Sequence, residues 1–312
     1  MAYPAPMIQS PCVDIDSALC TGCGLCLGVC PSEALEVEAG MAQATAELCL
    51  GCGHCQAVCP VGAVTAVAGL DLEASRFATF AADDRWLPFG EADTAALVRL
   101  MRSRRSCRNY LPSPVPRELL LDLAKIGATA PSGTNSQRWT FTLVPDRAAL
   151  ERVGSAVGDF FRRLNAMAQR PWLRRGLALF GKRELADYYE RYFDTVRDAL
   201  LRHEERGEDL LFHGAAAGIA VGSQPGASCP AEDALLATQN ILLAAHAMGL
   251  GTCLIGYVVE AARRDPAVTR AVGLPEGEAL YAFIALGWPG ERWARSAGRR
   301  MPVMRWADGG GD

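Results

Sequence analysis

Two copies of one cysteine pattern lie near the start of this chain, and thiolates in such runs bind metal. Each copy reads Cys-x2-Cys-x2-Cys-x3-Cys-Pro, the ligand spacing of proteins that hold two [4Fe-4S] clusters. In that arrangement the fourth cysteine of each run binds the cluster of the other run. The spacing therefore assigns one cluster to Cys20, Cys23, Cys26 and Cys59, and the second cluster to Cys49, Cys52, Cys55 and Cys30.

Two other uses of these cysteines fit less well. A structural zinc site usually takes two separated cysteine pairs, and a disulfide framework belongs to secreted proteins. His54 lies inside the second run. Because the cysteines already complete both ligand sets, we expect His54 to be a solvated loop residue.

The two runs also form an internal repeat with an offset of 29 residues, in which Gly22 and Gly24 recur as Gly51 and Gly53. Such a repeat predicts a pseudo-twofold module in which each half supplies ligands to both clusters. A module this small depends on its metal more than on an apolar core. On these motifs, the first 80 or so residues resemble the bacterial two-cluster ferredoxins, a family that transfers single electrons at low potential.

Length and charge divide the chain at the same place. The 312 residues suffice for a small module and one full-sized domain. Residues 1–80 have a net charge of −7 and residues 81–312 a net charge of +3. We expect a cluster module at 1–80, a linker at 81–92 with Pro88 and Gly90 as breakers, and a second domain at 93–312. The acidic module could dock on a basic partner or against its own second domain.

Several classes of function find no support in the sequence. The small positive charge of the second domain, without interleaved basic and aromatic residues, does not indicate nucleic-acid binding. The N-terminus carries no basic segment followed by an apolar run, and no uninterrupted apolar stretch is long enough to span a membrane. We expect a soluble protein of the cytoplasm, where a reducing environment preserves such clusters.

The hydrophobic pattern beyond the linker predicts helices and strands in an order typical of an α+β sandwich. Helices are expected from Ala95 to the arginine cluster, from Pro116 to Gly127, and over about 147–210 and 231–249, with a short irregular segment up to Gly256. Strands are expected at Thr140–Val144, Gly218–Gly222 and Leu280–Leu286. No Gly-x-Gly-x-x-Gly sequence occurs, so a Rossmann nucleotide site is not expected.

A basic segment, Arg104-Arg105-Ser106-Cys107-Arg108, follows the first of these helices. In extended chain, residues at i, i+2 and i+4 share a face, so Arg104, Ser106 and Arg108 could converge on one phosphate. A solvated basic helix end is the alternative interpretation of this segment taken alone.

Three further segments extend the pattern: Ala130-Pro131-Ser132-Gly133-Thr134-Asn135-Ser136-Gln137-Arg138-Trp139, Ala247-Met-Gly-Leu-Gly-Thr-Cys-Leu-Ile-Gly256, and Arg299-Arg300-Met-Pro302. Together with Arg-x-Ser-x-Arg, and in this order, they resemble the signature segments of the nitroreductase family of FMN flavoenzymes. The whole chain thus resembles ferredoxin–nitroreductase fusions, and the resemblance covers nearly all of its length.

The resemblance implies a set of FMN-binding residues at a homodimer interface. The phosphate and ribityl chain would be held by Arg104, Arg105, Ser106 and Arg108, with Arg299 and Arg300 closing from the C-terminal arm. The second subunit would line the isoalloxazine with Pro131, Ser132, Gly133, Asn135 and Gln137. Backbone amides of Leu254, Ile255 and Gly256 would lie near flavin N5, where charge develops on reduction.

The chain departs from the family pattern at two positions. Arg138 stands where proline is common, which could place a cation near the flavin edge, and Ile255 stands where glutamate is frequent. Cys107 and Cys253 lie inside these motifs, and we interpret both as packed small hydrophobic residues.

The resemblance also implies an activity. The two clusters would deliver two electrons to FMN, which would reduce a small organic acceptor of the nitroaromatic, quinone or activated-alkene class. Dehalogenation or ring reduction is a second possibility for the same cofactors. In many relatives NAD(P)H reduces the flavin directly, whereas the clusters here indicate a low-potential donor such as ferredoxin. A different class of function is electron transfer or redox sensing with a protein partner and no small substrate.

Residues 147–212 carry many aromatic side chains and could form a lid over the flavin, although ordinary helix packing explains them equally well. The catalytic proton donor is unknown from sequence, with Tyr188, Tyr192 and His213 as weak candidates. An open, aromatic-lined cavity would favour the enzyme, and a sealed flavin would favour the electron-transfer protein.

Overall fold

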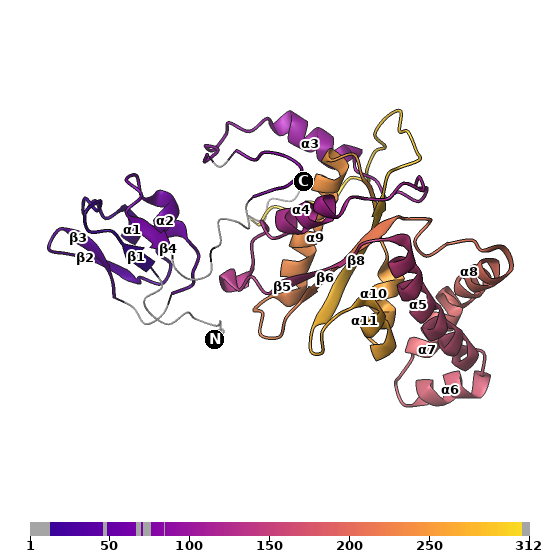
Figure 1. The fold of residues 1–312 in the computed structure, drawn as a ribbon. Coiled ribbons are helices and arrows are strands. Elements are labelled where there is room, and N and C mark those ends of the chain that lie inside the picture. Colours follow the sequence, from indigo (N-terminus) through magenta and orange to yellow (C-terminus); the bar gives the residue numbers. More distant parts are fainter. Residues whose placement is uncertain (1–12, 46–48, 67–69, 71–75, 84, 308–312) are drawn as a thin grey trace.

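The computed structural model describes residues 13–45, 49–66, 70, 76–83 and 85–307. They form a small N-terminal module and a larger α+β domain beside it (Figure 1). Within this described part, no helix is both long enough and apolar enough to cross a membrane.

The module consists of two short hairpin-like sheets and two single-turn helices. Its elements are β1 (Val13–Ile15), α1 (Leu25–Gly28), β2 (Leu35–Glu38), β3 (Met41–Ala44), α2 (His54–Val58) and β4 (Val64–Ala66), with β1 paired to β4 and β2 paired to β3, both antiparallel. The repeat is visible in the backbone, because Gly24 before α1 and Gly53 before α2 both have φ 72°. Left-handed backbone of this kind favours glycine.

The apolar core of this module is small. It contains Val13, Leu35, Ala42 and Val64, and the cysteines pack around them. A side chain at Gly22 would place its Cβ 2.2 Å from the carbonyl oxygen of Gly40, so only glycine fits there. A core of this size cannot stabilise the module alone, in agreement with a fold that depends on bound metal.

A four-stranded antiparallel sheet is the centre of the larger domain. Its strands follow the order β5-β6-β8-β7, where β5 is Trp139–Val144, β6 is Ala217–Ser223, β7 is Gly251–Leu254 and β8 is Ala279–Gly287. Side chains along β6 alternate between the two faces, with Ile219 and Val221 in one hydrophobic cluster and Ala220 in the other. The central strand β6 is therefore buried on both faces.

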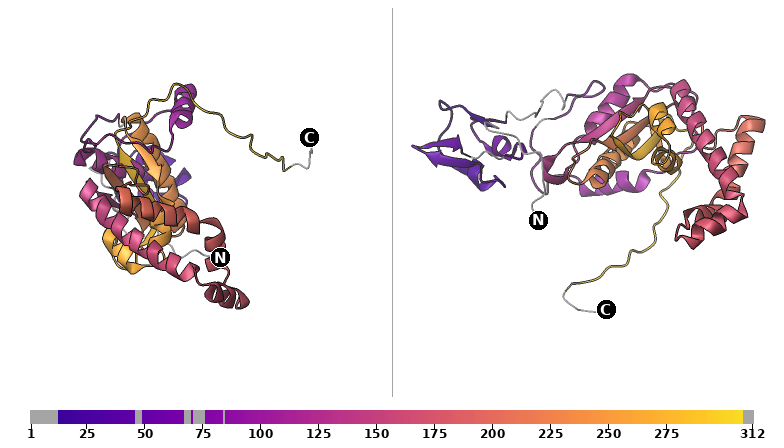
Figure 2. Two further views of the ribbon diagram at one scale, coloured as in Figure 1. Left: turned by 90° about the vertical axis from the view of Figure 1, so that its right-hand side faces the viewer. Right: turned by 90° about the horizontal axis from the view of Figure 1, so that it is seen from below.

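Helices cover both faces of this sheet (Figure 1). One face packs against α4 (Arg117–Gly127) and α9 (Pro230–Ala247), and the other against α5 (Arg147–Ala168), α10 (Gly256–Ala262) and α11 (Pro266–Val272). Three more helices, α6 (Pro171–Leu179), α7 (Glu184–Arg191) and α8 (Phe193–Arg206), extend from the end of α5. Helix α3 (Thr94–Ser103) follows the linker, and the residues after β8 leave the domain as an extended arm (Figure 2).

The α+β sandwich predicted from sequence is confirmed, with local corrections. Residues 147–210 form four helices: Pro171 starts a new helix after α5, Gly181 with φ 77° lies after α6, Tyr192 separates the last two helices, and Gly207 ends the fourth. The segment expected to be irregular before Gly256 is strand β7, which completes the sheet beside β8. This strand was missed because it has only four residues.

A buried carboxylate attaches residues 78 and 79, just before the expected linker, to the larger domain. Asp122 on α4 is 1% exposed and accepts hydrogen bonds from the backbone amides of Ala78 and Thr79 and from the Thr79 hydroxyl. Burial opposes its charge, but these hydrogen bonds and Lys125 outweigh burial and hold the pKa of Asp122 below its usual value. Asp122 thus fixes where the module's connection meets the domain.

We predict that Asp122→Ala lowers the free energy of unfolding of the larger domain by about 1–3 kcal/mol, because three hydrogen bonds to a buried carboxylate are lost. Urea unfolding followed by tryptophan fluorescence measures this change. The stabilisation is fully present above the unfolded pKa of about 3.9 and is lost as pH falls through the lower folded pKa, so wild type and variant converge in acid.

Asp83→Ala is the matched control, since Asp83 only forms an exposed ion pair with Arg85 in the same segment. An equal loss of stability in both variants would contradict the role of Asp122.

Candidate cluster and cofactor sites

The cysteines of the module line two separate pockets. One pocket is lined by Cys20, Cys23, Cys26 and Cys59, and the other by Cys30, Cys49, Cys52 and Cys55. Each pocket therefore brings together three thiols of one run and the fourth thiol of the other. These are the two sets that the spacing assigns to the two clusters.

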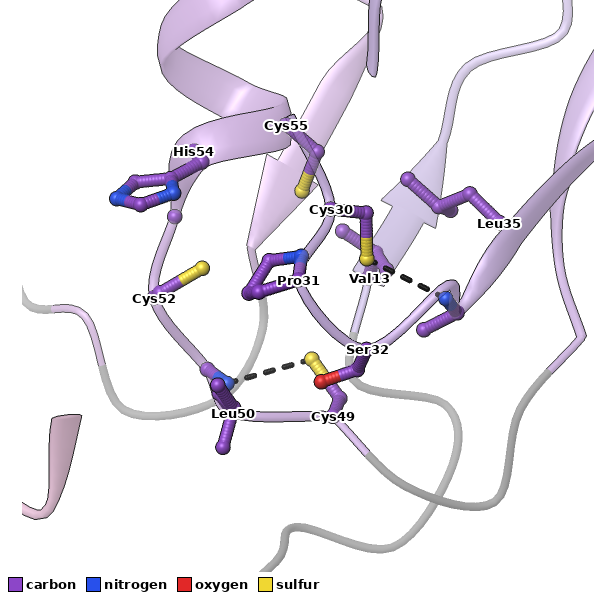
Figure 3. Close-up of a pocket in the computed structure, with 13 residues that line it drawn as sticks. Val13, Cys30, Pro31, Ser32, Leu35, Cys49, Leu50, Cys52, His54 and Cys55 are labelled. Carbon is purple, nitrogen blue, oxygen red and sulfur yellow. Dashed lines mark hydrogen bonds between the residues drawn. The ribbon is translucent and has the colours of Figure 1, made fainter. Parts of the chain in front are cut away.

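Backbone amides point at several of these sulfurs. Ala34 donates to Cys30 Sγ at 3.3 Å and Gly51 to Cys49 Sγ at 3.3 Å (Figure 3), and Ala63 donates to Cys59 Sγ at 3.2 Å. Amide hydrogen bonds stabilise negative charge on sulfur and help to set the reduction potential of an iron–sulfur cluster. Four thiols with this donor set fit a cluster in each pocket. His54 is exposed as expected, but it begins helix α2 and does not lie in a loop.

The thiols differ in how readily they become thiolates, the form that binds metal. Burial raises the pKa of Cys26 and of Cys55. Burial also opposes the Cys59 thiolate, but hydrogen bonds from the backbone of residues 61–64 outweigh it and lower the pKa of Cys59. Bound metal must therefore supply the charge that deprotonates Cys26 and Cys55.

A group of arginines without acidic partners lies where α3 ends. Burial lowers the pKa of Arg104, and repulsion by Arg299 and Arg105 adds to this effect, which places the C-terminal arm beside α3. Arg105 also donates to the Ala297 carbonyl at 2.8 Å. Among the described residues, no salt bridge involves any of the five arginines Arg104, Arg105, Arg108, Arg299 and Arg300. The group therefore offers uncompensated positive charge to an anion.

Arg104, Ser106 and Arg108, which the sequence predicts to share a face, all lie near Cys253. All three affect the pKa of Cys253 in β7. Burial raises this pKa, and the two arginines and a hydrogen bond with Ser106 oppose the rise. Ser106 also forms a parallel β-bridge with Thr252. The basic segment therefore lies beside β7, joined to it by this isolated bridge and by a hydrogen bond from the Cys107 amide to the Thr252 carbonyl.

Cys107 and Cys253 are buried, at 3% and 4% exposed. Cys107 does more than fill space, because its thiol donates to Glu291 Oε2 at 2.9 Å. Burial and this hydrogen bond raise the pKa of Cys107 to about 12, so the thiol stays protonated. Glu291 thereby ties the start of the C-terminal arm to the basic segment, a contact that the sequence gave no reason to expect.

The loop from Pro131 to Gln137 has a strained backbone. Thr134, Asn135 and Gln137 all have φ near +50°, a region that residues other than glycine seldom adopt. Asp233 on α9 holds this loop: it is 2% exposed and accepts from the Gly133 amide at 2.9 Å and the Ser136 hydroxyl at 3.3 Å. Strain maintained by a buried carboxylate is typical of a functional loop.

Other predicted residues around this loop have local partners. Ser132 Oγ accepts from the Gln137 amide at 3.0 Å, and Arg138 donates to the Pro225 carbonyl at 2.8 Å. The side chain of Asn135 donates to the carbonyl oxygens of Leu50 and Gly51 in the cluster module.

A large cavity of about 1240 Å³ opens beside β7 and α10. Its wall includes Cys253, Leu254, Ile255 and Gly256, together with the aromatic side chains of Phe160, Phe161, Tyr188, Tyr192 and Tyr257. Leu254 and Gly256 are exposed, whereas Ile255 is buried and its amide donates to the Phe283 carbonyl at 2.8 Å. The Ile255 amide is therefore already occupied.

The aromatic wall comes from three helices. Phe161 of α5 stacks with Tyr188 of α7 at a centroid separation of 6.4 Å and meets Tyr257 of α10 edge-on at 5.4 Å. Trp172 and Phe180 of the α6 region are instead exposed to solvent. Part of the 147–212 segment thus lines the cavity, and another part does not.

All three weak candidates for a proton donor line this cavity. Tyr188 donates to Asn165 Oδ1 at 2.7 Å, and burial raises its pKa. Burial, opposed by Asp209 and aided by Arg108, lowers the pKa of His213, so this imidazole is neutral at pH 7. Tyr192 is about half exposed.

Comparison with known proteins accounts for both parts of the chain. Residues 101–288 match the model of the nitroreductase family, and residues 12–60 match the model of the 4Fe-4S dicluster domain. The chain belongs to the nitroreductase family. It carries a 4Fe-4S dicluster domain in front of the nitroreductase domain.

Relatives of this nitroreductase domain carry different names. A Thermus thermophilus protein named NADH dehydrogenase is 28% identical over 70% of this chain and 96% of its own length. A Rhodospirillum rubrum protein named 5,6-dimethylbenzimidazole synthase is 30% identical over 62% of this chain and 82% of its own length. The relatives thus support an oxidoreductase without specifying its acceptor.

A solved structure shows the same fold. The Bacteroides fragilis nitroreductase with bound FMN superimposes with a TM-score of 0.51 at 21% identity, over 67% of this chain and 98% of that chain.

Sequence reasoning missed three residues of these sites. In the sequence, Asp233 only interrupts an apolar helix, and Glu291 lies outside every motif. Tyr257 directly follows the Ala247–Gly256 segment but is not part of it. The position of Asp233 in the first turn of α9 was a usable signal, since a buried acid there normally holds a neighbouring backbone.

We predict that paired substitutions distinguish crossed from uncrossed ligation. Cys23→Ala with Cys59→Ala removes two thiols from one pocket, so about half of the iron remains. Cys23→Ala with Cys30→Ala removes one thiol from each pocket, so both clusters are lost. Iron and sulfide content per chain measures the difference. The reverse result would mean that each run holds its own cluster.

Proposed function

We propose that this protein is an iron–sulfur flavoprotein oxidoreductase. It passes electrons from two [4Fe-4S] clusters to FMN and from FMN to a small organic acceptor of the nitroaromatic, quinone or activated-alkene class. The observation that carries this proposal is the open aromatic cavity, which lies beside the uncompensated arginines in a chain that also has two four-thiol pockets.

The residues present fit the phosphate end of FMN. Arg104, Arg105 and Arg299 lie close together without acidic partners, and a phosphate dianion would relieve their mutual repulsion. Ser106 and Arg108 lie near Cys253, as Arg104 does, and would complete the phosphate and ribityl contacts. Arg300 follows Arg299 on the arm and would add a further positive charge near the phosphate.

The ring of FMN would lie against Leu254 and Gly256 at the cavity wall, with the partner's copy of the 131–137 loop on its edge. The residues of this loop that would contact the ring edge are Pro131, Ser132, Gly133, Asn135 and Gln137. When bound, FMN accepts single electrons and donates a hydride, which joins one-electron clusters to a two-electron reduction. The chain itself would orient the acceptor in the cavity and supply the proton.

The cavity supports an enzyme over an electron-transfer protein without a small substrate. Its volume and its rim of Phe161, Tyr188 and Tyr257 suit a planar acceptor stacked on aromatic side chains. A flavoprotein that served only a protein partner would not need a chamber of this size. His213 and Tyr188 line it, and we propose them as the groups that transfer the proton.

We propose a low-potential ferredoxin as the electron donor. A ferredoxin supplies electrons singly, as the two clusters would accept them, whereas NAD(P)H delivers a hydride. NAD(P)H is the competing donor, supported by the name of the Thermus relative. Both donors, and the preservation of the clusters, agree with a cytoplasmic location.

A homodimer would complete the site. Several large apolar side chains of α3 and of the arm are at least about one-third exposed in the single chain. They are Leu97, Val98, Met101, Met301 and Val303. An extended arm with exposed apolar side chains among its arginines (Figure 2) suits packing against a second copy.

Anaerobic titration tests the proposed route. We expect reduced ferredoxin to bleach the cluster bands and then the flavin band, because electrons enter through the module. We expect NADH and NADPH to leave both bands unchanged. Flavin reduction by a nicotinamide with the clusters untouched would contradict the route through the clusters.

We further predict that Arg104→Ala weakens FMN binding by about 10- to 100-fold, the cost of one charge-assisted phosphate contact. Quenching of FMN fluorescence on addition to apoprotein measures the affinity. Arg99→Ala is the control, since Arg99 is an exposed arginine earlier on α3. Equal affinities in the two variants would place the phosphate elsewhere.

A further inference from the structure

One side chain joins the two parts of the chain at a chemically informative point. Asn135 Nδ2 donates to the Gly51 carbonyl at 2.9 Å and to the Leu50 carbonyl at 3.3 Å. Leu50 and Gly51 lie between Cys49 and Cys52 and line the pocket of Cys30, Cys49, Cys52 and Cys55. Among the described residues, no other hydrogen bond links the 13–66 module to the larger domain.

The other end of this contact is held rigidly. Asn135 belongs to the strained loop that the buried Asp233 fixes through Gly133 and Ser136. The amide of Gly51 in turn donates to Cys49 Sγ at 3.3 Å. A short hydrogen-bonded chain thus runs from a cluster sulfur through Gly51 to Asn135.

The pocket of Cys20, Cys23, Cys26 and Cys59 has no such connection in the described part of the chain. Cys23 is exposed, and the β2–β3 hairpin with its acidic side chains lies on the side away from the larger domain (Figures 1 and 2). The two pockets therefore differ in their surroundings, although the repeat makes them alike locally.

The 131–137 loop does not line the cavity of its own chain. The residues that line the cavity beside Leu254 include Arg108 and Tyr257 but none of residues 131–137. If the loop contacts a flavin, as the proposed function requires, that flavin is held by the arginines of the partner. The cluster beside the loop then belongs to a different chain from those arginines.

We infer that the cluster in the Cys30, Cys49, Cys52 and Cys55 pocket is the one that reduces the flavin, and that it reduces the flavin held by the partner's arginines. This inference rests on the proposed function and adds the order and direction of electron flow. The cluster in the Cys20, Cys23, Cys26 and Cys59 pocket accepts electrons from outside and passes them on.

The electrons balance with a named donor. An external one-electron donor of the ferredoxin class is oxidised twice, and the two electrons pass singly through the module to FMN. One proton from solvent joins the reduced ring. Asn135 moves no charge itself; it is a positioning residue that keeps the cluster loop against the flavin loop.

Mixed dimers test the direction. In the first, one chain carries Cys52→Ala and the other carries Arg104→Ala with Arg108→Ala, so flavin binds only to the arginines of the first chain. In the second, a wild-type chain pairs with a chain that carries all three substitutions. Stopped-flow absorbance after addition of reduced ferredoxin records flavin bleaching in each, alongside the wild-type dimer.

We expect rapid bleaching in the first dimer, where the intact cluster lies on the chain opposite the flavin arginines, and loss of bleaching in the second. The opposite pattern, or bleaching in both, would overturn the inference while leaving the proposed function intact. Absence of bleaching in the wild-type dimer would overturn the proposed function and, with it, this inference.

A second measurement does not depend on flavin reduction. Asn135→Ala removes the two hydrogen bonds that withdraw charge from the loop around Cys49 and Cys52. We expect the reduction potential and electron paramagnetic resonance spectrum of one cluster to shift, to lower potential, while the other is unchanged. The cluster lost in Cys52→Ala identifies which one shifts.

Ser228→Ala is the matched control, because Ser228 contacts Thr134 of the same loop and not the module. Unchanged spectra in Asn135→Ala, or equal shifts in the control, would show that Asn135 does not couple the loop to this cluster.

Discussion

The crossing of one thiol from each cysteine run into the pocket of the other is the constraint on which the N-terminal module depends. Cys30 and Cys59 leave their own runs and complete the opposite pockets. Neither half can therefore fold around its metal without the other, and the few apolar residues of the module cannot replace that linkage. The same crossing places the two pockets side by side within one small unit, as a relay of single electrons requires.

A second constraint is the position of the flavin loop. Three residues other than glycine hold a left-handed backbone there, and the buried Asp233 is the anchor that keeps them so. The loop presents Asn135 toward the module, which gives a reason for storing strain at this point. The larger domain supplies a rigid base, because β6 is buried on both faces and α9, which carries Asp233, packs on the sheet.

The two parts of the chain carry net charges of opposite sign. The module is acidic, whereas the described arginines around Arg104 have no acidic partners and offer positive charge to an anionic group. The aromatic cavity lies beyond the arginines and is closed on one side by helices that branch from α5. Membership of the nitroreductase family explains the sandwich and the motif order, while the dicluster domain explains the additional module.

The sequence by itself determined the chemistry of both parts. Cysteine spacing is a local property, and it predicted which thiols gather, because seven residues of chain can reach only one cluster. The alternate spacing of Arg104, Ser106 and Arg108 led to the expectation of a shared face, and short apolar runs located β5, β6 and β8. Which residues from distant parts of the chain come into contact was decided by the tertiary structure alone. Strand β7 exists because β8 offers it an edge, Asp233 reaches Gly133 across 100 residues, and Asn135 meets Gly51 across 84. Such contacts depend on the packing of whole elements, which no local pattern records.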